Sequence, residues 1–312
     1  MSDSIQQVNS IFEQPWWLDA VAPGQWEAAE IERDGNIIAR LPYLKTKRFG
    51  SKILGVPDYT QTLGYWIENT GAKNAKRFGR QKDLVSELIE KLPKRYSADF
   101  FLDHSCDYLF PFKWSGYNLQ MQYSYRLNDI KDIDVLWSGL ADNIRREIKK
   151  AQKIVVVEEN HPIDDLITLQ NKTFERQGRK IKDNSELLKR LDNVLQEHNA
   201  RKLFCAVDAD GQIHAASYFV YDSNCCYYLI GGGDPELRTS GASSLLMWEG
   251  IKFASGVSNA FDFEGSMIEP IERFFRAFGG VPTPYWRVTK LNWILSMAEY
   301  FKPKIKNILG WK

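Results

Sequence analysis

The chain lacks the features that mark several classes of protein. Its 312 residues include four cysteines but no Cys-x-x-Cys pair, and the adjacent Cys225 and Cys226 are poorly placed to bridge each other. It has no apolar run of about 18 residues, and its first residues lack a charged start followed by an apolar core. These absences argue against a disulfide scaffold, a spanning helix and a secretory leader. We expect reduced thiols and a cytoplasmic protein.

Metal-ligand spacing and a strong net charge are also missing. The histidines, at positions 104, 161, 198 and 214, have no such spacing, so no metal is expected. With 41 basic and 40 acidic residues the formal charge is +1, and any attraction to a polyanion must come from local clustering. What the chain does have is 44% hydrophobic residues, enough for two cores of ordinary size.

A weak internal repeat supports two similar halves. Residues 34–39, Asp-Gly-Asn-Ile-Ile-Ala, are echoed by residues 210–215, Asp-Gly-Gln-Ile-His-Ala. Asp-Gly between alternating segments is typical of a hairpin, because the tight turn needs the positive φ that these residues tolerate. A chance match is the alternative. Together with the length, duplication of one α/β unit is favoured, and we divide the chain into residues 1–120 and 121–312.

The second half has the more complete pattern of helices and strands. Apolar periodicity predicts helices over residues 136–153, 163–177, 185–199, 240–253 and 268–278. Alternating or apolar runs predict strands over residues 154–158, 202–208, 212–221, 225–230 and 260–263, with a last strand at 285–290 and a helix at 292–301. This order predicts a central mixed sheet with helices on its faces.

One loop has the chemistry of a phosphate site. Arg238, Gly241 and Ser243 precede or open a predicted helix, where uncapped N–H groups and the positive dipole end can hold a pyrophosphate. Gly231 and Gly232 follow a buried strand, where glycine lets a ligand approach closely. The alternatives are a surface salt bridge for Arg238 and a loop without contacts. The pattern implies a cofactor that carries phosphates.

Two carboxylates follow that helix. Asp262 and Glu264 lie two apart on a short aromatic strand, so both side chains leave it on one face. Such a carboxylate can act as the base that takes a proton from an attacking amine, with Glu264 ahead because it is nearer the strand end. The alternative is an ion pair with an arginine or a cap for the next segment. Ser266 and Glu269 have the spacing of a capping box before the next helix.

These residues resemble the GNAT acyltransferase superfamily, and more narrowly its Fem-type and BioF2-like branch. The basic stretch at residues 143–153 and the block at residues 262–280 extend the resemblance over residues 125–288. The resemblance implies an α/β (α+β) fold of two GNAT-like halves, each a central mixed sheet flanked by helices. It also implies an enzyme that transfers an acyl or aminoacyl group to an amine. Residues 1–120 would then be the acceptor side, and residues 121–312 the donor and catalytic side.

The donor implied by the resemblance is acyl-CoA, with acetyl-CoA as the first choice. Ala242 joins the phosphate loop, and backbone N–H groups near Leu229 would stabilise the oxyanion. Many GNAT enzymes have a tyrosine acid where this chain has Phe275, which cannot donate a proton. Either Tyr285 or Tyr228 supplies the proton, or the leaving group is not a thiolate. An aminoacyl ester on tRNA fits the second possibility.

The resemblance also suggests an acceptor: an amine of a cell-envelope polysaccharide or peptidoglycan precursor, either a small molecule or lipid-linked. Tyr59 and Gln61 lie in a loop that resembles the acceptor-side loop of BioF2-like proteins, although a plain turn explains it nearly as well. Arg145 and Lys149 belong to the basic stretch at residues 143–153, on a predicted helix. That helix is either a solvated face or a site for a polyphosphate acceptor, tRNA or an anionic membrane.

A second basic and aromatic patch lies near the carboxyl terminus, at Lys302, Lys304, Lys306, Trp311 and Lys312. It allows a position at the inner face of the membrane as an alternative to the free cytoplasm. Two other functions stay open. One is an aminoacyl-tRNA-dependent peptidoglycan bridge ligase, although the chain lacks the long helical arm of many Fem-type ligases. The other is a non-catalytic GNAT-like binding module.

Overall fold

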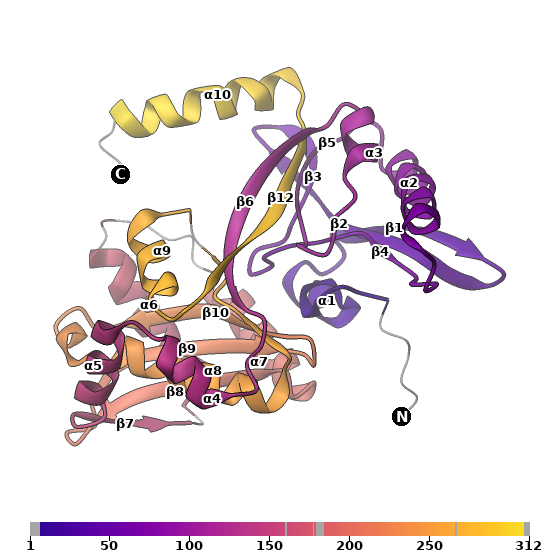
Figure 1. Ribbon diagram of the computed structural model, residues 1–312. Helices are drawn as coiled ribbons and strands as arrows, with labels where there is room; N and C mark the ends of the chain where they lie inside the picture. Colours follow the sequence, from indigo (N-terminus) through magenta and orange to yellow (C-terminus); the bar gives the residue numbers. More distant parts are fainter. Residues whose placement is uncertain (1–6, 160, 177, 179–183, 266, 309–312) are drawn as a thin grey trace. The chain divides into compact units, whose positions relative to one another are not determined.

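The computed structural model describes residues 7–159, 161–176, 178, 184–265 and 267–308, with side chains to residue 301 (Figure 1). The chain divides into two compact units, each described below by itself. Unit 1 comprises Met1–Gln122 and Pro284–Lys312, and unit 2 comprises Tyr123–Thr283. Ser266 of the predicted capping box and the side chains of the carboxyl-terminal basic patch lie outside the described residues.

Unit 1 is a mixed sheet with strand order β1-β2-β3-β5-β12. Its strands are β1 (Trp26–Arg33), β2 (Asn36–Arg48), β3 (Ser51–Gly55), β5 (Ser97–Leu102) and β12 (Val281–Lys290), with the short β4 (Trp66–Ile67) beside β2. Its helices are η1 (Ile11–Glu13), α1 (Pro15–Val21), α2 (Asn74–Lys91), α3 (Phe110–Trp114) and α10 (Trp293–Ile308). Only the β3–β5 pairing is parallel among those described.

The core of unit 1 depends on one amphipathic helix, α2. Leu84, Val85 and Leu88 form the buried stripe of α2, and they pack against inward residues of the sheet such as Leu41 and Phe100. Fully burying one such side chain stabilises the fold by roughly 1.5–3 kcal/mol. This stripe therefore fixes α2 on one face of the sheet.

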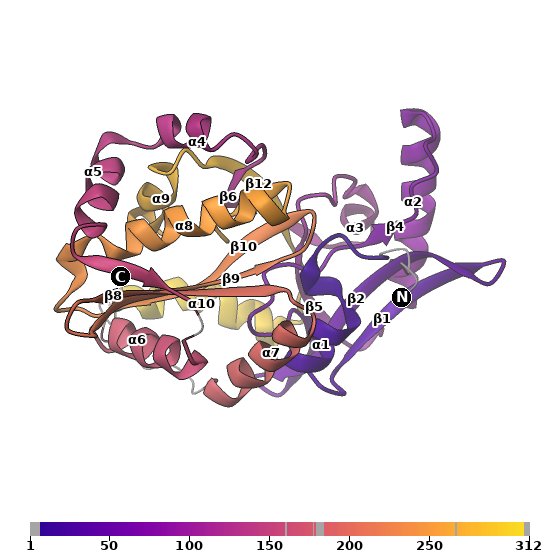
Figure 2. The ribbon, with the colours of Figure 1, turned by 90° about the horizontal axis from the view of Figure 1, so that it is seen from below.

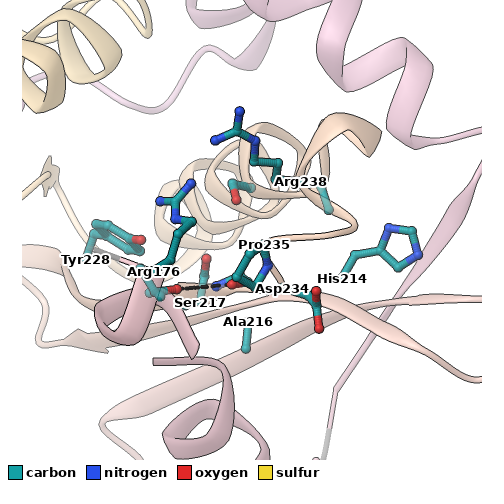
Figure 3. Close-up of a pocket in the computed structure, with 14 residues that line it drawn as sticks. Arg176, His214, Ala216, Ser217, Tyr228, Asp234, Pro235 and Arg238 are labelled. Carbon is teal, nitrogen blue, oxygen red and sulfur yellow. Dashed lines mark hydrogen bonds between the residues drawn. The ribbon is translucent and has the colours of Figure 1, made fainter. Parts of the chain in front are cut away.

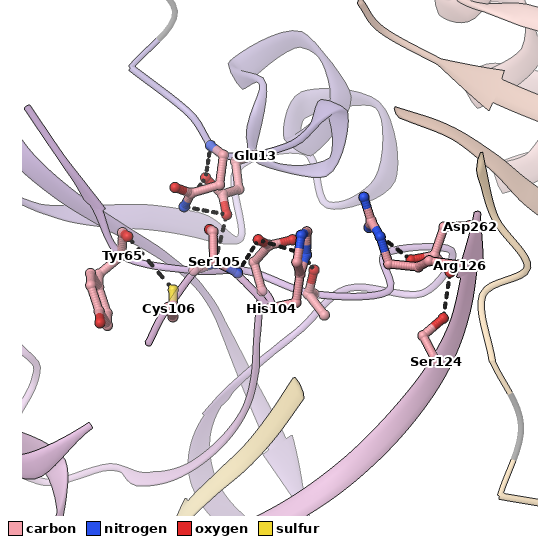
Figure 4. Close-up of polar contacts among 12 residues, drawn as sticks. Glu13, Tyr65, His104, Ser105, Cys106, Ser124, Arg126 and Asp262 are labelled. Carbon is pink, nitrogen blue, oxygen red and sulfur yellow. Dashed lines mark hydrogen bonds and ion pairs between the residues drawn. The ribbon is translucent and has the colours of Figure 1, made fainter. Parts of the chain in front are cut away.

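A buried polar cluster also ties together distant segments of unit 1 (Figure 4). Glu13 is 1% exposed, and its carboxylate accepts hydrogen bonds from the backbone N–H of Asn9 at 2.8 Å and of Gly64 at 2.7 Å. Burial, and then the nearby Asp103, raise the pKa of Glu13 to about 8. The hydrogen bonds to Glu13 join the amino-terminal segment to the loop before Tyr65.

Unit 2 is a second mixed sheet, with strand order β6-β11-β10-β9-β8-β7. Its strands are β6 (Asn118–Leu127), β11 (Ala260–Asp262), β10 (Cys225–Gly233), β9 (Ile213–Tyr221), β8 (Arg201–Asp208) and β7 (Val155–Glu158). Its helices are α4 (Ile133–Gly139), α5 (Asp142–Ala151), α6 (Ile163–Arg176), α7 (Ser185–Glu197), η2 (Arg238–Ser240), α8 (Ala242–Val257) and α9 (Glu269–Arg276). Figure 2 shows α6 and α7 on one face of this sheet and α8 on the other.

The two units share one topology. In unit 2 the strands β8, β9, β10, β11 and β6 pair in the sequence antiparallel, antiparallel, parallel, antiparallel. The strands β1, β2, β3, β5 and β12 of unit 1 repeat that sequence. A mixed α/β fold of two similar halves is therefore confirmed.

The two Asp-Gly hairpins occupy equivalent places in this topology, as the repeat predicts. The first joins β1 to β2 by a two-residue turn, with Asp34 at φ 52° and Gly35 at φ 78°. The second joins β8 to β9 through a longer loop, in which Gly211 has φ 78°. Positive φ at each glycine is the conformation for which the dipeptide was predicted.

The last strand of each unit comes from the other half of the sequence. β12 follows α9 of unit 2 along the chain but pairs with β5 of unit 1, from Trp286 with Leu102 to Lys290 with Ala98. β6 follows α3 of unit 1 and pairs with β11, through Arg126 and Leu127. Residues 284–312, which the sequence analysis assigns to the second half, therefore group with unit 1. A pairing between segments so far apart leaves no local signal in the sequence.

All four cysteines are free thiols, and all four are buried. No helix among the described residues is long and apolar enough to cross a membrane.

Candidate functional site

A cavity of about 220 Å³ lies within unit 2, where the end of β10 meets α6 and the start of α8. Figure 3 shows the side chains around it, including Arg176, Ser217, Tyr228 and Arg238. The full lining is Thr173, Arg176, His214, Ala216, Ser217, Tyr228, Gly231, Gly232, Gly233, Asp234, Pro235, Arg238, Ala242 and Ser243. The cavity thus brings together the glycines and the phosphate loop that the sequence analysis selected.

The glycines belong to strand β10 and not to the loop that the sequence analysis expects after it. The register of β10 against β9 shifts at Leu229, because Tyr228 pairs with Phe219 and Ile230 with Tyr218. This bulge leaves Leu229 outside the regular ladder. The strand then continues to Gly233. The glycines therefore pair with β9 although they have no side chains.

Two of these glycines permit close approach. A Cβ at Gly231 would lie 1.7 Å from the hydroxyl oxygen of Tyr228, and one at Gly232 would lie 2.6 Å from the backbone nitrogen of Gln170 in α6. Thr173 holds the same strand end, since its Oγ1 accepts from the N–H of Gly233 at 3.0 Å. Glycine is therefore needed here for packing within unit 2, whatever ligand the cavity binds.

The phosphate loop opens α8 as predicted. Gly241 is the N-cap residue of α8 at φ 82°, and a Cβ there would lie 2.6 Å from the carbonyl oxygen of Glu147 in α5. Ser240 Oγ accepts from the N–H of Ala242 at 3.3 Å. The side chains of Arg238 and Ser243 are exposed and line the cavity. Ala242 and Ser243 of the first turn of α8 therefore line the cavity at the positive end of the helix dipole.

Two cations at the cavity have no anionic partner. Arg238 and Arg176 are both exposed, and neither makes an ion pair or hydrogen bond within the part of the chain that the structure describes. Figure 3 shows the two guanidinium groups pointing in the same direction. By contrast, Lys172 is neutralised by Asp234 at 2.7 Å. The arrangement suits an anionic ligand with more than one charge.

Asp262 is a buried ion-pair residue (Figure 4). It is 2% exposed, and its Oδ2 lies 3.0 Å from Nη1 of Arg126 on β6, which is 6% exposed. Its Oδ1 accepts from the hydroxyl of Ser124 and from the N–H of Glu264, the latter at 2.7 Å. These contacts correspond to the ion-pair alternative of the sequence analysis, with Arg126 as the partner.

Glu264 differs from Asp262 in its backbone conformation, its hydrogen bonding and its pKa. Its backbone has φ 55°, which is uncommon for a residue with a side chain. Its Oε1 is buried without a hydrogen-bond partner among the described residues. Burial, and then the charge of Asp262, hold the pKa of Glu264 well above its usual range. A carboxyl group in this state is suited to proton transfer.

Comparison with known families fits this geometry. Residues 138–266 match the family model described as an acetyltransferase (GNAT) domain. Unit 2 carries a GNAT domain. The match supports an acyltransferase, and it includes the bulged strand, the phosphate loop and Glu264. No curated protein matches the chain in a sequence comparison.

Solved structures resemble the chain over most of its length. FemX matches with a TM-score of 0.64 at 14% identity, covering 88% of this chain and 91% of that one. The carboxyl-terminal domain of a putative lysylphosphatidylglycerol synthetase from Agrobacterium fabrum matches with 0.60 at 12%, covering 90% and 89%. L-PGS from Bacillus licheniformis matches with 0.52 at 12%, covering 88% of each. At such identities these likenesses show the fold alone.

In the GNAT domain the position of the usual tyrosine acid is apolar. Phe275 is 6% exposed and packs 5.2 Å from the ring of Phe263 and 6.3 Å from that of Tyr228. Tyr228 lines the cavity, and burial raises its pKa to about 12 despite a hydrogen bond with Ser217. Of the two phenols considered from the sequence, Tyr228 is the one beside this cavity.

The other predicted site residues lie elsewhere. Tyr285 belongs to unit 1, where its ring lies 6.3 Å from that of Phe101. Tyr59 and Gln61 follow β3 in the same unit, and Tyr59 has φ 59°. The catalytic role of Tyr285 and the acceptor contacts of Tyr59 and Gln61 stay predictions.

The two basic residues of α5 differ from each other. Arg145 is engaged within unit 2, because its Nη1 donates to the carbonyl of Ser138 at 2.9 Å and its Nη2 pairs with Asp142. Lys149 is exposed, and no partner for it occurs among the described residues. Neither lines the cavity. The contacts give Arg145 a bracing role between α4 and α5.

Sequence analysis did not select Arg176, Thr173 or Ser217. Arg176 and Thr173 lie on the helix α6, and Ser217 lies within β9. Nothing local distinguishes a polar helix residue that meets a cavity from one that meets solvent. No group of three potential metal ligands occurs among the described residues.

Proposed function

We propose that the protein is an N-acyltransferase that binds acyl-CoA, with acetyl-CoA as the first choice, in the cavity of unit 2. The observation that carries the proposal is a pair of arginines, Arg176 and Arg238, beside the first turn of α8, for which no anionic partner occurs among the described residues. A pyrophosphate would receive N–H groups from that turn and charge-assisted hydrogen bonds from the arginines. The acyl thioester would then extend along the glycine end of β10.

The chemistry would take place where β10 and β11 separate. Tyr227 of β10 and Asp262 of β11 are the last paired residues of these parallel strands. Leu229 and Glu264 each lie two residues further along the sequence. The bulged Leu229 offers a backbone N–H to the oxyanion. Glu264, with its unpartnered oxygen, takes the proton of the attacking amine.

The reaction balances with one acid and one base. The amine nitrogen bonds to the thioester carbonyl carbon and gives its proton to Glu264. Collapse of the tetrahedral intermediate breaks the carbon–sulfur bond, and Tyr228 donates its phenolic proton to the leaving sulfur. The raised pKa of Tyr228 keeps this phenol protonated at neutral pH. In this proposal Tyr228 does the work of the missing tyrosine at position 275.

For the acceptor we propose an amine of a cell-envelope polysaccharide or peptidoglycan precursor, either small or lipid-linked. This part rests on the resemblance to the Fem-type and BioF2-like branch, with Tyr59 and Gln61 as the proposed contacts. It is consistent with an enzyme in the cytoplasm or at the inner face of the membrane.

A second candidate is transfer of an aminoacyl group from charged tRNA. Phe275 favours it, because an ester releases a ribose hydroxyl and does not need the usual tyrosine to protonate a thiolate. The exposed Lys149 on α5 is available for a phosphate backbone. FemX and the lysylphosphatidylglycerol synthetases match in fold, which is compatible with this candidate.

Thermal unfolding with each donor tests the choice. We expect CoA and acetyl-CoA at millimolar concentration to raise Tm, because a ligand that binds only the native state stabilises it by RT ln(1 + [L]/Kd). Sodium chloride at matched ionic strength is the control for non-specific charge, because pyrophosphate is the group that the site is proposed to hold. Protection by charged tRNA without protection by CoA would move the assignment to the second candidate. If neither donor protects, the protein is a GNAT-like binding module.

A further inference from the structure

Helix α10 of unit 1 presents an apolar stripe to solvent. Its exposed side chains are Trp293 at 76%, Ile294 at 38%, Met297 at 49%, Tyr300 at 63% and Phe301 at 41%. The positions follow the spacing i, i+1, i+4, i+7 and i+8, which places them along one side of a helix. So large an apolar surface on one helix is not explained by packing within unit 1.

The opposite side of α10 is held by unit 1. Leu295 is 1% exposed, and Glu299 lies 3.3 Å from Nη2 of Arg287 on β12. The N–H of Asn292, just before the helix, donates to Ser97 Oγ at 2.9 Å. These contacts fix the rotation of α10 about its axis, so the apolar stripe faces away from the rest of unit 1.

The β2–β3 hairpin adds a second apolar element next to this helix. Its tip is Phe49, 73% exposed, at φ 50° beside Gly50 at φ 75°. A phenylalanine in the left-handed region is strained, and exposure gives it no packing energy in return. Arg48, the preceding residue, lies 3.7 Å from Glu299 of α10, so tip and helix are neighbours within unit 1.

Cations flank both elements. Lys47 and Lys52 are exposed on either side of Phe49. In the sequence, Lys302, Lys304, Lys306 and Lys312 follow the stripe, and no acidic residue occurs after Glu299. Tryptophan and tyrosine with adjacent lysines are the composition that prefers the boundary between water and an anionic bilayer.

From these observations we infer that the stripe of α10 binds an anionic lipid membrane, with the nearby tip of the β2–β3 hairpin as a second contact. The apolar side chains enter the headgroup region, and Lys47 and Lys52 meet lipid phosphates. A second copy of the chain would also bury the stripe. It would bring its own lysines to the contact, however, and place like charges together. Charge complementarity therefore favours the lipid surface.

Co-sedimentation with vesicles tests this inference independently of the acyl-transfer reaction. The protein should bind phosphatidylcholine vesicles that contain phosphatidylglycerol, bind pure phosphatidylcholine vesicles much less, and lose binding as salt is raised. The double variant Trp293→Ser, Met297→Ser should lower the partition coefficient at least about tenfold. The single variant Phe49→Ser should lower it less.

Val135→Ser is the matched control, because Val135 is a 63% exposed apolar residue on α4 of unit 2. It should bind vesicles as the wild type does. Phe49→Ser leaves α10 untouched, so it also tests the surface if the double variant fails to fold. The inference is overturned if the wild type does not distinguish the two vesicles, or if both variants bind like the wild type. It is also overturned if sedimentation shows a dimer that the double variant dissociates.

Discussion

Each unit has a buried aspartate that pairs with an arginine on the corresponding strand, but only in unit 2 does a glutamate follow two residues later. In unit 1, Asp99 of β5 lies 2.7 Å from Nε of Arg287 on β12. In unit 2, Asp262 of β11 lies 3.0 Å from Arg126 on β6. Two residues after the aspartate, unit 1 has Phe101 and unit 2 has Glu264. Because the pair recurs where no cavity glycines occur, we propose that it supports the fold and that Glu264 takes part in the chemistry.

The two units also differ in how they bury a glutamate. Glu13 of unit 1 accepts hydrogen bonds from two backbone N–H groups and from the side chain of Asn9. Glu264 of unit 2 keeps a buried oxygen without a partner among the described residues. Leaving such an atom unsatisfied costs about 1–3 kcal/mol. Natural folds retain that cost mainly where a ligand or a proton uses the atom.

The largest expected effect is on catalysis by Glu264→Gln. The carboxamide keeps the shape of the side chain but cannot take a proton, so kcat should fall by ~10²–10⁴ with little change in donor KM. Steady-state kinetics with acetyl-CoA and an amine acceptor measure this. In the wild type, kcat/KM should rise with pH as Glu264 ionises, at a pH above that of an ordinary carboxyl. A variant with normal turnover and an unchanged pH profile would show that another group is the base.

Both aspartates should support stability if the pairs are structural. Asp262→Asn leaves the buried Arg126 without its countercharge, so it should lower the free energy of unfolding by about 3–5 kcal/mol. Asp99→Asn should lower it less, because Arg287 is only partly buried and also pairs with Glu299 at 3.3 Å. Denaturant titration of both variants gives the comparison. The sequence analysis considered Asp262 as a second base. A folded, fully stable Asp262→Asn protein with kcat reduced as in Glu264→Gln would restore that role.

Glu13 should make stability depend on pH. The unfolded chain loses this proton near pH 4.5, whereas the folded chain keeps it until about pH 8. The unfolded state therefore binds fewer protons in this window, and the free energy of unfolding should fall as pH rises through it, by roughly 2–4 kcal/mol. The nearby Asp103 does not titrate between these two pH values, because its pKa is lowered to about 2. Glu13→Gln should flatten the profile between pH 4.5 and pH 8; an unchanged slope would assign it to other groups.

The smallest expected effect is on donor affinity. Arg238→Ala removes a charge-assisted contact to phosphate, worth roughly 1.5–3 kcal/mol, so donor KM should rise about ten- to a hundredfold with kcat nearly unchanged. Arg273→Ala is the matched control, because Arg273 is exposed in the same unit but does not line the cavity. If both variants bind CoA equally well, the loop is a helix cap and not a phosphate site.

Local signals in the sequence predicted most elements of unit 2. The helix expected over residues 163–177 is α6, at Ile163–Arg176, because its apolar periodicity is regular. The helix expected over residues 136–153 is two helices, α4 and α5, broken after Gly139. There the N–H of Ala141 donates to the carbonyl of Ala277 at 2.9 Å. That tertiary contact has no signature in the window around it.

The candidate site was predictable where one segment carries it. Arg238 and Gly241 lie close together along the chain, so their spacing alone predicted the phosphate loop. Arg176 and Tyr228 reach the cavity from α6 and β10, and their meeting depends on strand pairing and helix packing. Glu264 was selected by type and position. Its contrast with Asp262 depends on Arg126, which pairs with Asp262 from a strand more than a hundred residues earlier.

The exchange of β6 and β12 also has a consequence for synthesis of the chain. During translation, residues 1–122 leave the ribosome long before residues 284–290, yet β5 needs the latter as its neighbour. Until then β5 has an open edge, and open edges invite pairing with other chains. The sheet of unit 1 can therefore be completed only when nearly the whole protein has been made. A nascent chain stalled after residue 122 would be incomplete and prone to associate, whereas β6 is already available when the GNAT domain emerges.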